Sequence, residues 1–271
     1  MQLMKRILKY LLVFVAAVAV TACADDSGEA SYKSESAFRA LFPNCSADKW
    51  ATEPGYEIAY FSFHGNPSEA WFDHNGWVMT YRRSCCEKLP QKAQDELSDS
   101  YSLWETVGVH RADRKGLAAV YVVTVERNKV VYDLYFAEDG TLVRKSDVTN
   151  SKSGTAKYLP APANAGVSSA MSEKYPDAVV YNAVVKDGAY LIAFVTGGAA
   201  KTAVFANDGG WLFTTTPLNG AFVSKDIVKT VGEQLPGAKI LACTLTETQS
   251  STFYTVECDY EGTLHTLYLD K

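Results

Sequence analysis

The sequence predicts an α+β protein made of tandem repeats, each with one helix followed by a four-stranded antiparallel sheet. The first observation is a recurring hairpin in which a Phe stands four residues before a turn Gly: Phe72 with Gly76, Phe136 with Gly140, and Phe205 with Gly209. The second is spacing, because these glycines lie 64 and 69 residues apart, as tandem duplication produces. The third is the many short alternating runs rich in Val, Thr and Tyr, which favour strands.

The first unit is expected to open with a helix over residues 35–42, where apolar side chains have helical spacing and Pro43 ends the run. Asn75-Gly76 supplies the turn of the recurring hairpin, because Gly tolerates the positive φ that a tight turn needs. The expected strands of this unit are residues 48–52, 56–63, 68–73 and 77–83.

The second unit opens at Leu89-Pro90, since Pro is well placed at the start of a helix, and residues 91–100 continue it. Its expected strands are residues 103–111, 118–127, 130–137 and 141–145. Residues 148–158 are polar and rich in Ser, Thr, Lys and Gly, which is typical of a linker.

The third unit opens with the same dipeptide, Leu159-Pro160, and its helix closes at Tyr175-Pro176. Its expected strands are residues 179–185, 189–196, 201–206 and 211–215. The fourth unit begins at Pro217-Leu218, with a helix over residues 224–234. It has three expected strands, residues 239–246, 252–259 and 263–270.

This order of a helix, Phe-Pro or Tyr-Pro-Asp-Ala, an aromatic-rich strand and Trp71-Phe-Asp-His-Asn-Gly76 resembles the PepSY-like, β-lactamase-inhibitor-protein-like (BLIP-like) family of bacterial envelope proteins. The resemblance implies that units pair into longer curved antiparallel sheets with helices on one face. The implied domains are residues 35–147, with units 35–86 and 87–147, and residues 159–271, with units 159–216 and 217–271.

The N-terminal residues are typical of an export signal and are not expected to be part of a folded domain. Residues 1–22 have a basic start and then an apolar run that is too short to span a bilayer, which is typical of a signal peptide. Its end, Val20-Thr21-Ala22-Cys23, resembles a bacterial lipobox, so Cys23 is the expected lipidation site; the alternative is an ordinary secretory signal. Residues 23–34 suit a flexible tether, and the acidic pair Asp25-Asp26 resembles a surface-export signal. We therefore expect a lipid-anchored protein of the cell envelope, on either side of the outer membrane.

Composition and net charge limit the classes of partner that the protein can bind. The chain has 271 residues, 47% of them hydrophobic and 12% aromatic, which is enough for two domains with real cores. The formal net charge is −5, and it becomes −8 without the three basic residues of the signal peptide. A nucleic-acid-binding protein needs a basic surface, so that class is excluded.

The cysteines fit an oxidising compartment. Cys243 and Cys258 lie on two runs expected to pair, so a disulfide between them is the first expectation. Cys45 with Cys85 or Cys86 is the second. A zinc site is the competing interpretation, and the missing Cys-x-x-Cys and the spacing of the four His argue against it.

No catalytic set emerges. The sequence has no Gly-x-Ser-x-Gly and no His with an evident partner, and the would-be calcium loop at Asp73–Gly76 lacks its closing Glu. We therefore expect no catalytic residue, metal or cofactor. Strand alternation instead places aromatic and polar residues on the sheet face opposite the helices, and the candidate binding residues are Glu69, Trp71, Asp133, Tyr135 and Tyr268.

These features lead to a ranked set of functions. The first is a non-catalytic envelope lipoprotein that binds a protein or peptide through this open sheet face, as an inhibitor does. The alternative is a structural or stress-related envelope lipoprotein, in which the aromatic residues only brace the sheet. A hydrolase ranks last.

Overall fold

The computed structural model describes residues 30–85, 88–161, 164–218 and 223–271. The chain divides into two compact units, Met1–Pro160 and Ala161–Lys271. The signal peptide, Cys23, Cys86 and most of the tether lie outside the described residues, so the expectations placed on them stay predictions.

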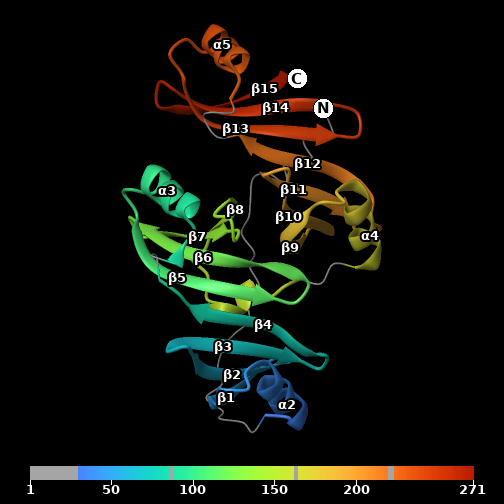
Figure 1. Cartoon of the computed structure of the whole chain (residues 1–271). Coiled ribbons are helices and arrows are strands. Elements are labelled where there is room, and N and C mark those ends of the chain that lie inside the picture. Colours follow the sequence, from blue (N-terminus) through green and yellow to red (C-terminus); the bar gives the residue numbers. More distant parts are fainter. Residues whose placement is uncertain (1–29, 86–87, 162–163, 219–222) are drawn as a thin grey trace. The chain divides into compact units, whose positions relative to one another are not determined.

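The first unit contains an antiparallel sheet of eight strands in chain order, counted over the described ranges (Figure 1). Pairing of β4 with β5, from Met79 opposite Arg114 to Arg83 opposite His110, joins the first two repeats into one sheet. The strands are β1 (Ala47–Glu53), β2 (Tyr56–Phe63), β3 (Asn66–Asp73), β4 (Gly76–Arg83), β5 (Glu105–Arg114), β6 (Leu117–Arg127), β7 (Val130–Phe136) and β8 (Leu142–Asp147).

The second unit repeats this design with seven strands in its described part, again in chain order. Here β12 pairs with β13, from Phe213 opposite Thr248 to Leu218 opposite Cys243, so two repeats again share one sheet. The strands are β9 (Val179–Lys186), β10 (Ala189–Thr196), β11 (Ala199–Ala206), β12 (Trp211–Leu218), β13 (Lys239–Thr248), β14 (Thr252–Tyr260) and β15 (Thr263–Asp270). The α+β fold with two paired-repeat domains is confirmed.

In the described part of the chain, each repeat has one α-helix: α2 (Tyr32–Leu41), α3 (Gln91–Ser100), α4 (Ala165–Lys174) and α5 (Lys225–Gln234). The side-chain oxygens of Ser31, Asn164 and Ser224 each accept a hydrogen bond from the backbone N–H three residues later, which caps α2, α4 and α5. These caps set the helix starts. The tether prediction is therefore wrong from Tyr32 onward.

The recurring Phe lies on the helix side of each sheet, as predicted. Phe72 packs with Phe38 of α2, Phe136 with Ala93 of α3, and Phe205 with Met171 of α4 in three separate hydrophobic clusters. All three Phe side chains are fully buried. The repeated hairpin is therefore the unit that carries the core.

The hairpin turns differ in how closely they approach the helices. At Gly209 φ is +92°, and an added Cβ would lie 2.9 Å from the carbonyl oxygen of Gly166 in α4. At Gly76 φ is +107°, but an added Cβ would meet nothing within 4 Å. The glycine of the first turn therefore has open space beside it, whereas the glycine of the third turn is packed against backbone atoms of α4.

This contrast gives a matched stability test. Gly209→Ala combines a strained backbone with a clash against backbone atoms, so we expect it to lower the free energy of unfolding by about 2–4 kcal/mol. Gly76→Ala has only the strain and should cost about 1–2 kcal/mol. Urea unfolding of both variants measures the two losses in free energy of unfolding. Equal losses would show that the third turn is no more tightly packed than the first.

Two expectations about boundaries need correction. Pro217 was expected to begin the fourth unit, but β12 extends to Leu218 and places Pro217 opposite Thr244 of β13. The polar segment 148–158 was expected to be a linker, but it includes the 3-10 helix η2 (Gly154–Tyr158) and belongs to the first unit. This segment is central to the site described below.

The predicted disulfide between Cys243 and Cys258 is absent, because both are free thiols buried in the core beside α5. Their strands do pair, but Cys243 lies opposite Val256 and Cys258 opposite Ile240, with a register shift between Ile240 and Ala242. The two thiols are therefore diagonal rather than opposite, and disulfide geometry is demanding. Burial raises the pKa of both thiols. Cys45 and Cys85 are also free.

Candidate binding face of the first sheet

Four of the five predicted binding residues lie on one face of the first sheet. Glu69 and Trp71 alternate with Ala70 and Phe72 on β3, and Asp133 and Tyr135 alternate with Leu134 and Phe136 on β7. Because the alternate residues pack in the clusters with α2 and α3, the four candidates face the other way. We call this the helix-free face. Tyr268, 39% exposed, lies on β15 in the other unit.

The helix-free face is covered rather than open at these positions. Relative exposure is 2% for Trp71, 0% for Asp133 and 3% for Tyr135, and Glu69 is half-buried. The predicted exposure of the first three is therefore wrong. The sequence could not show this, because part of the cover comes from the segment that was predicted to be a linker.

Tyr158, at the end of η2, inserts its side chain into the helix-free face. Its ring stacks on Tyr81 of β4, with 4.6 Å between ring centroids and 11° between planes, and meets Tyr135 of β7 edge-on at 6.2 Å. Its hydroxyl donates a hydrogen bond of 2.9 Å to Asp133 Oδ2. One side chain therefore reaches strands that are three positions apart in the sheet.

Asp133 is the charged centre of this contact. Lys157 Nζ lies 2.9 Å from Asp133 Oδ2, and Thr124 Oγ1 donates a 2.7 Å hydrogen bond to Oδ1. The side chain of Lys157 is 24% exposed, whereas that of Asp133 is fully buried. A buried carboxylate is tolerated only when it is paired and hydrogen-bonded, and Thr124, Lys157 and Tyr158 provide this.

Glu69 holds the other end of η2. Thr155 Oγ1 donates a 2.5 Å hydrogen bond to Glu69 Oε2, which also accepts one of 3.2 Å from Trp71 Nε1. The two carboxylates of the predicted face thus bind two ends of a single short segment. The structure brings Glu69 and Asp133 together through Thr155, Lys157 and Tyr158.

The tyrosines here stay uncharged over a wide pH range. Burial is the main cause that raises the pKa of Tyr81, Tyr135 and Tyr158 above the usual tyrosine value, and the charge of Asp133 adds to it. Their hydroxyls therefore remain available as hydrogen-bond donors. His110 stacks on Tyr81, with 4.6 Å between centroids, and extends the aromatic stack.

His110 predicts a pH dependence of stability. Burial, and then the charge of Arg83, lowers its pKa below 6.5; Lys157 acts in the same direction and Asp133 against it. Its contribution to stability is therefore fully present above the unfolded-state pKa and is lost as pH falls through the lower folded-state pKa. The melting temperature should drop when the pH is lowered from about 7.5 to about 5, and we expect this drop to be smaller in His110→Phe than in the wild type. Equal slopes in both proteins would contradict this assignment.

Comparison with known proteins agrees with this fold. The family described as "Putative beta-lactamase-inhibitor-like, PepSY-like" matches residues 56–144 and 181–270, which together make up more than half of the chain. The chain belongs to this family. One matched stretch lies in each unit, so the PepSY-like domain occurs twice. No curated protein matches the chain.

Several solved structures are similar. A BLIP-like protein from Bacteroides fragilis is 32% identical, with 48% of this chain and 95% of that one covered and a TM-score of 0.44. A DUF2874 family protein from Bacteroides ovatus is 22% identical, with 48% and 99% covered and a TM-score of 0.44. A protein from Bacteroides eggerthii named "putative periplasmic" is 19% identical, with 48% and 96% covered and a TM-score of 0.44.

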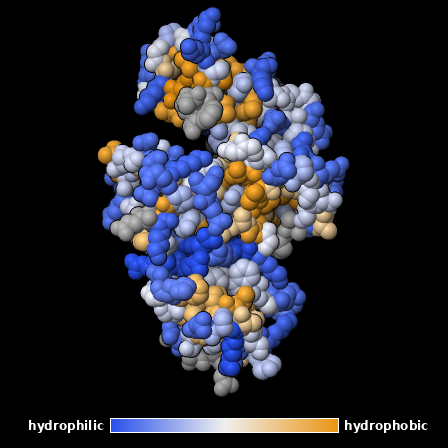
Figure 2. Space-filling view, viewed as in Figure 1, coloured by the Kyte–Doolittle hydropathy of each residue, from blue (hydrophilic) through white to orange (hydrophobic). Residues whose placement is uncertain are grey.

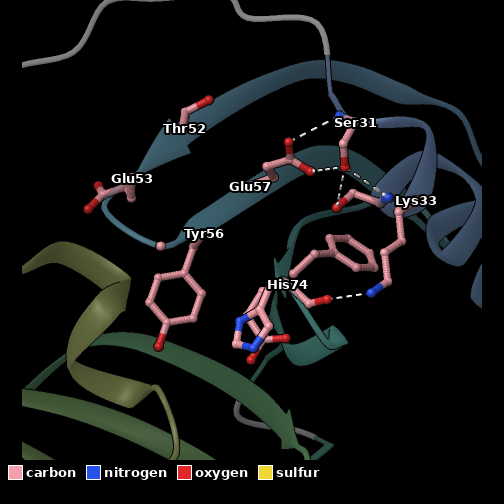
Figure 3. Close-up of a pocket in the computed structure, with 11 residues that line it drawn as sticks. Ser31, Lys33, Thr52, Glu53, Tyr56, Glu57 and His74 are labelled. Carbon is pink, nitrogen blue, oxygen red and sulfur yellow. Dashed lines mark hydrogen bonds between the residues drawn. The ribbon is translucent and has the colours of Figure 1, made fainter.

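The PepSY-like first unit also has a pocket of about 310 Å³ between the N-terminus of α2 and the turns β1–β2 and β3–β4 (Figure 3). Ser31 donates to Glu57 from its backbone N, at 3.0 Å, and from its Oγ, at 2.7 Å. Lys33 Nζ donates to the carbonyl of His74. Burial raises the pKa of Glu57, but hydrogen bonds from Ser34 and Ser31 outweigh it and lower the pKa overall. These groups cap a helix and hold a turn, so we assign no ligand.

Metal sites, membrane-spanning helices and exposed apolar surface are three further features that could indicate a function. Within the described ranges, no group of three or more His, Cys, Asp or Glu could hold a metal ion. No helix among these residues is long and apolar enough to cross a membrane. Figure 2 shows apolar surface beside α5 of the second unit. Among the exposed apolar side chains of this unit are Val228 of α5 and Leu241 of β13. Single exposed apolar residues are ordinary on a protein surface.

Sequence reasoning missed Tyr81, His110, Thr155, Lys157 and Tyr158 as parts of this face. A usable signal was present: Tyr158 is the only aromatic residue in a polar segment of Ser, Thr, Lys and Gly. A lone aromatic residue in such a segment often marks the point where the segment packs against the rest of the protein, because a tyrosine side chain stabilises the fold only when it is buried. The linker prediction rested on the polar composition of the whole segment and gave no weight to this one residue.

Proposed function

We infer that the protein is a non-catalytic binding protein of the bacterial cell envelope, which holds a segment of a partner protein on the helix-free face of its first sheet. The observation that carries this proposal is the set of contacts made by η2. The face already holds a peptide segment through two carboxylates, Glu69 and Asp133, and an aromatic slot formed by Tyr81 and Tyr135. A surface that binds one segment in this way has the chemistry to bind another.

Inhibition of an envelope enzyme is the specific form of binding that the family description favours. An inhibitor of this kind needs no reactive group, only a surface on which a loop of the enzyme is held. Enzyme–inhibitor interfaces gain their affinity from a few buried aromatic and charged anchors. Asp133, Tyr81 and Tyr135 supply that combination here.

The proposal is tested by crosslinking in cells, followed by quantitative identification of proteins bound to the wild type and two variants. Asp133→Asn removes the charge at the centre of the face, and Asp48→Asn changes an exposed Asp on β1 of the same sheet. We expect one partner to be recovered with the wild type and with Asp48→Asn but lost with Asp133→Asn. Equal recovery with both variants, or no enriched protein, would overturn the proposal.

Lipid anchoring at Cys23 on the outer membrane is part of the same proposal. Several acyl chains on one Cys make membrane attachment effectively stable. We expect Cys23→Ser to abolish lipid labelling and to release the protein from the membrane fraction. Unchanged fractionation with unchanged labelling would contradict it.

A structural role in the envelope is the second candidate, favoured by the fact that the protein's own chain already covers the face. In that case Trp71 and Tyr135 only stabilise the sheet. A deletion strain with altered envelope integrity, together with no partner in the crosslinking experiment, would support this role instead.

A further inference from the structure

We propose that residues Thr155–Tyr158 act as an internal competitor, occupying the place of a partner segment that carries a basic residue directly followed by tyrosine. This inference rests on the proposed function and specifies both the ligand and its regulation. It starts from the way η2 is held: Thr155, Lys157 and Tyr158 each reach the sheet through a side-chain atom. Side-chain contacts of this kind can be reproduced by another chain with the same residues.

The chemistry of the ligand follows from Asp133. Its carboxylate is fully buried and paired with Lys157, so the segment that best replaces η2 brings a cation to the same place. Lysine and arginine are the cations of protein segments that can do so. Thr124 stays on the sheet in either case, since it is part of β6.

The aromatic slot sets the neighbouring residue. Tyr81 and Tyr135 hold the ring of Tyr158 by stacking and edge-on contact, and the ring hydroxyl reaches Asp133. Phenylalanine would fill the slot but lose the hydrogen bond. The preferred partner sequence is therefore Lys-Tyr or Arg-Tyr, preceded two residues before the basic residue by a hydroxyl that can reach Glu69 as Thr155 does.

The covalent connection explains why η2 competes well. Only residues 148–153 separate η2 from the end of β8 at Asp147. A short tether gives the attached segment an effective local concentration in the millimolar range. At that concentration even a weakly binding segment occupies the face most of the time. A free peptide therefore meets an occupied face and binds only when η2 leaves. Since departure uncovers the charge of Asp133, release of η2 and arrival of the partner are coupled.

The test uses the full chain in detergent and a fluorescent synthetic peptide with the sequence of residues 151–161, Ser-Lys-Ser-Gly-Thr-Ala-Lys-Tyr-Leu-Pro-Ala. The variant Lys157→Ala with Tyr158→Ala removes the internal competitor's side chains. We expect this variant to bind the peptide at least about tenfold more tightly than the wild type does. A peptide with Ala in place of its Lys-Tyr pair should not bind, and adding Asp133→Asn to the variant should abolish binding.

Two results would overturn the inference: no binding of the peptide to a double variant that keeps its circular dichroism spectrum, or equal affinity for the double variant and the wild type. If the double variant does not fold, Tyr158→Phe replaces it, because it keeps the ring and loses only the hydrogen bond to Asp133. It should then bind the peptide more tightly than the wild type by a smaller factor, and an unchanged affinity would count against the inference. Crosslinking that depends on Asp133 without any peptide binding would remove the inference and leave the proposed function standing.

Discussion

Asp133→Ala is expected to lower the free energy of unfolding of the first domain by about 3–5 kcal/mol, because it leaves the partly buried Lys157 without its partner. It also removes the acceptor for Tyr158 and Thr124, so η2 should detach and its amides should lose protection from hydrogen exchange. Chemical denaturation together with hydrogen exchange measures both effects.

The matched control is Asp48→Ala, in the same sheet but exposed, which should change stability by no more than about 0.5 kcal/mol. A loss below about 1 kcal/mol in Asp133→Ala, with η2 still protected, would show that the ion pair is not what holds the segment.

Phe205→Ala should have an effect of similar size in the second domain, about 3–5 kcal/mol, because a large, fully buried side chain is replaced by a cavity. Phe205 packs against α4 in the cluster with Met171 and Phe194, so the loss should also loosen α4. Leu212→Ala on β12 is the control, because Leu212 is exposed and its truncation should cost about 1 kcal/mol or less. Similar losses for the two variants in urea would mean that the repeated Phe does not carry the core.

The fold could be predicted because its information is local. Within each of the two described sheets, the strands pair in chain order, so turn residues and alternation suffice to place strands and to assign faces. The faces of Phe72, Phe136 and Phe205 followed from a period of two, and the structure confirms them. Family membership followed from the same repeated hairpin.

The errors come from contacts that local pattern does not encode. The cover on Asp133 and Tyr135 depends on Tyr158, which is far from Glu69 and Tyr81 in sequence. The expected disulfide fails because the β13–β14 register places Cys243 opposite Val256, which leaves Cys258 in a diagonal position, and the exact register of two strands cannot be read from their residues alone. The early start of α2 follows from the Ser31 cap, which the apolar pattern alone did not reveal.

On this proposal, the helix-free face recognises a basic residue followed by tyrosine. This recognition is tested most directly by selecting random peptides of about eight residues on the Lys157→Ala, Tyr158→Ala variant and on the same variant carrying Asp133→Asn. We predict that Lys-Tyr and Arg-Tyr pairs are enriched on the first protein and not on the second. Absence of such pairs from the first selection, or the same enrichment on both proteins, would contradict the account.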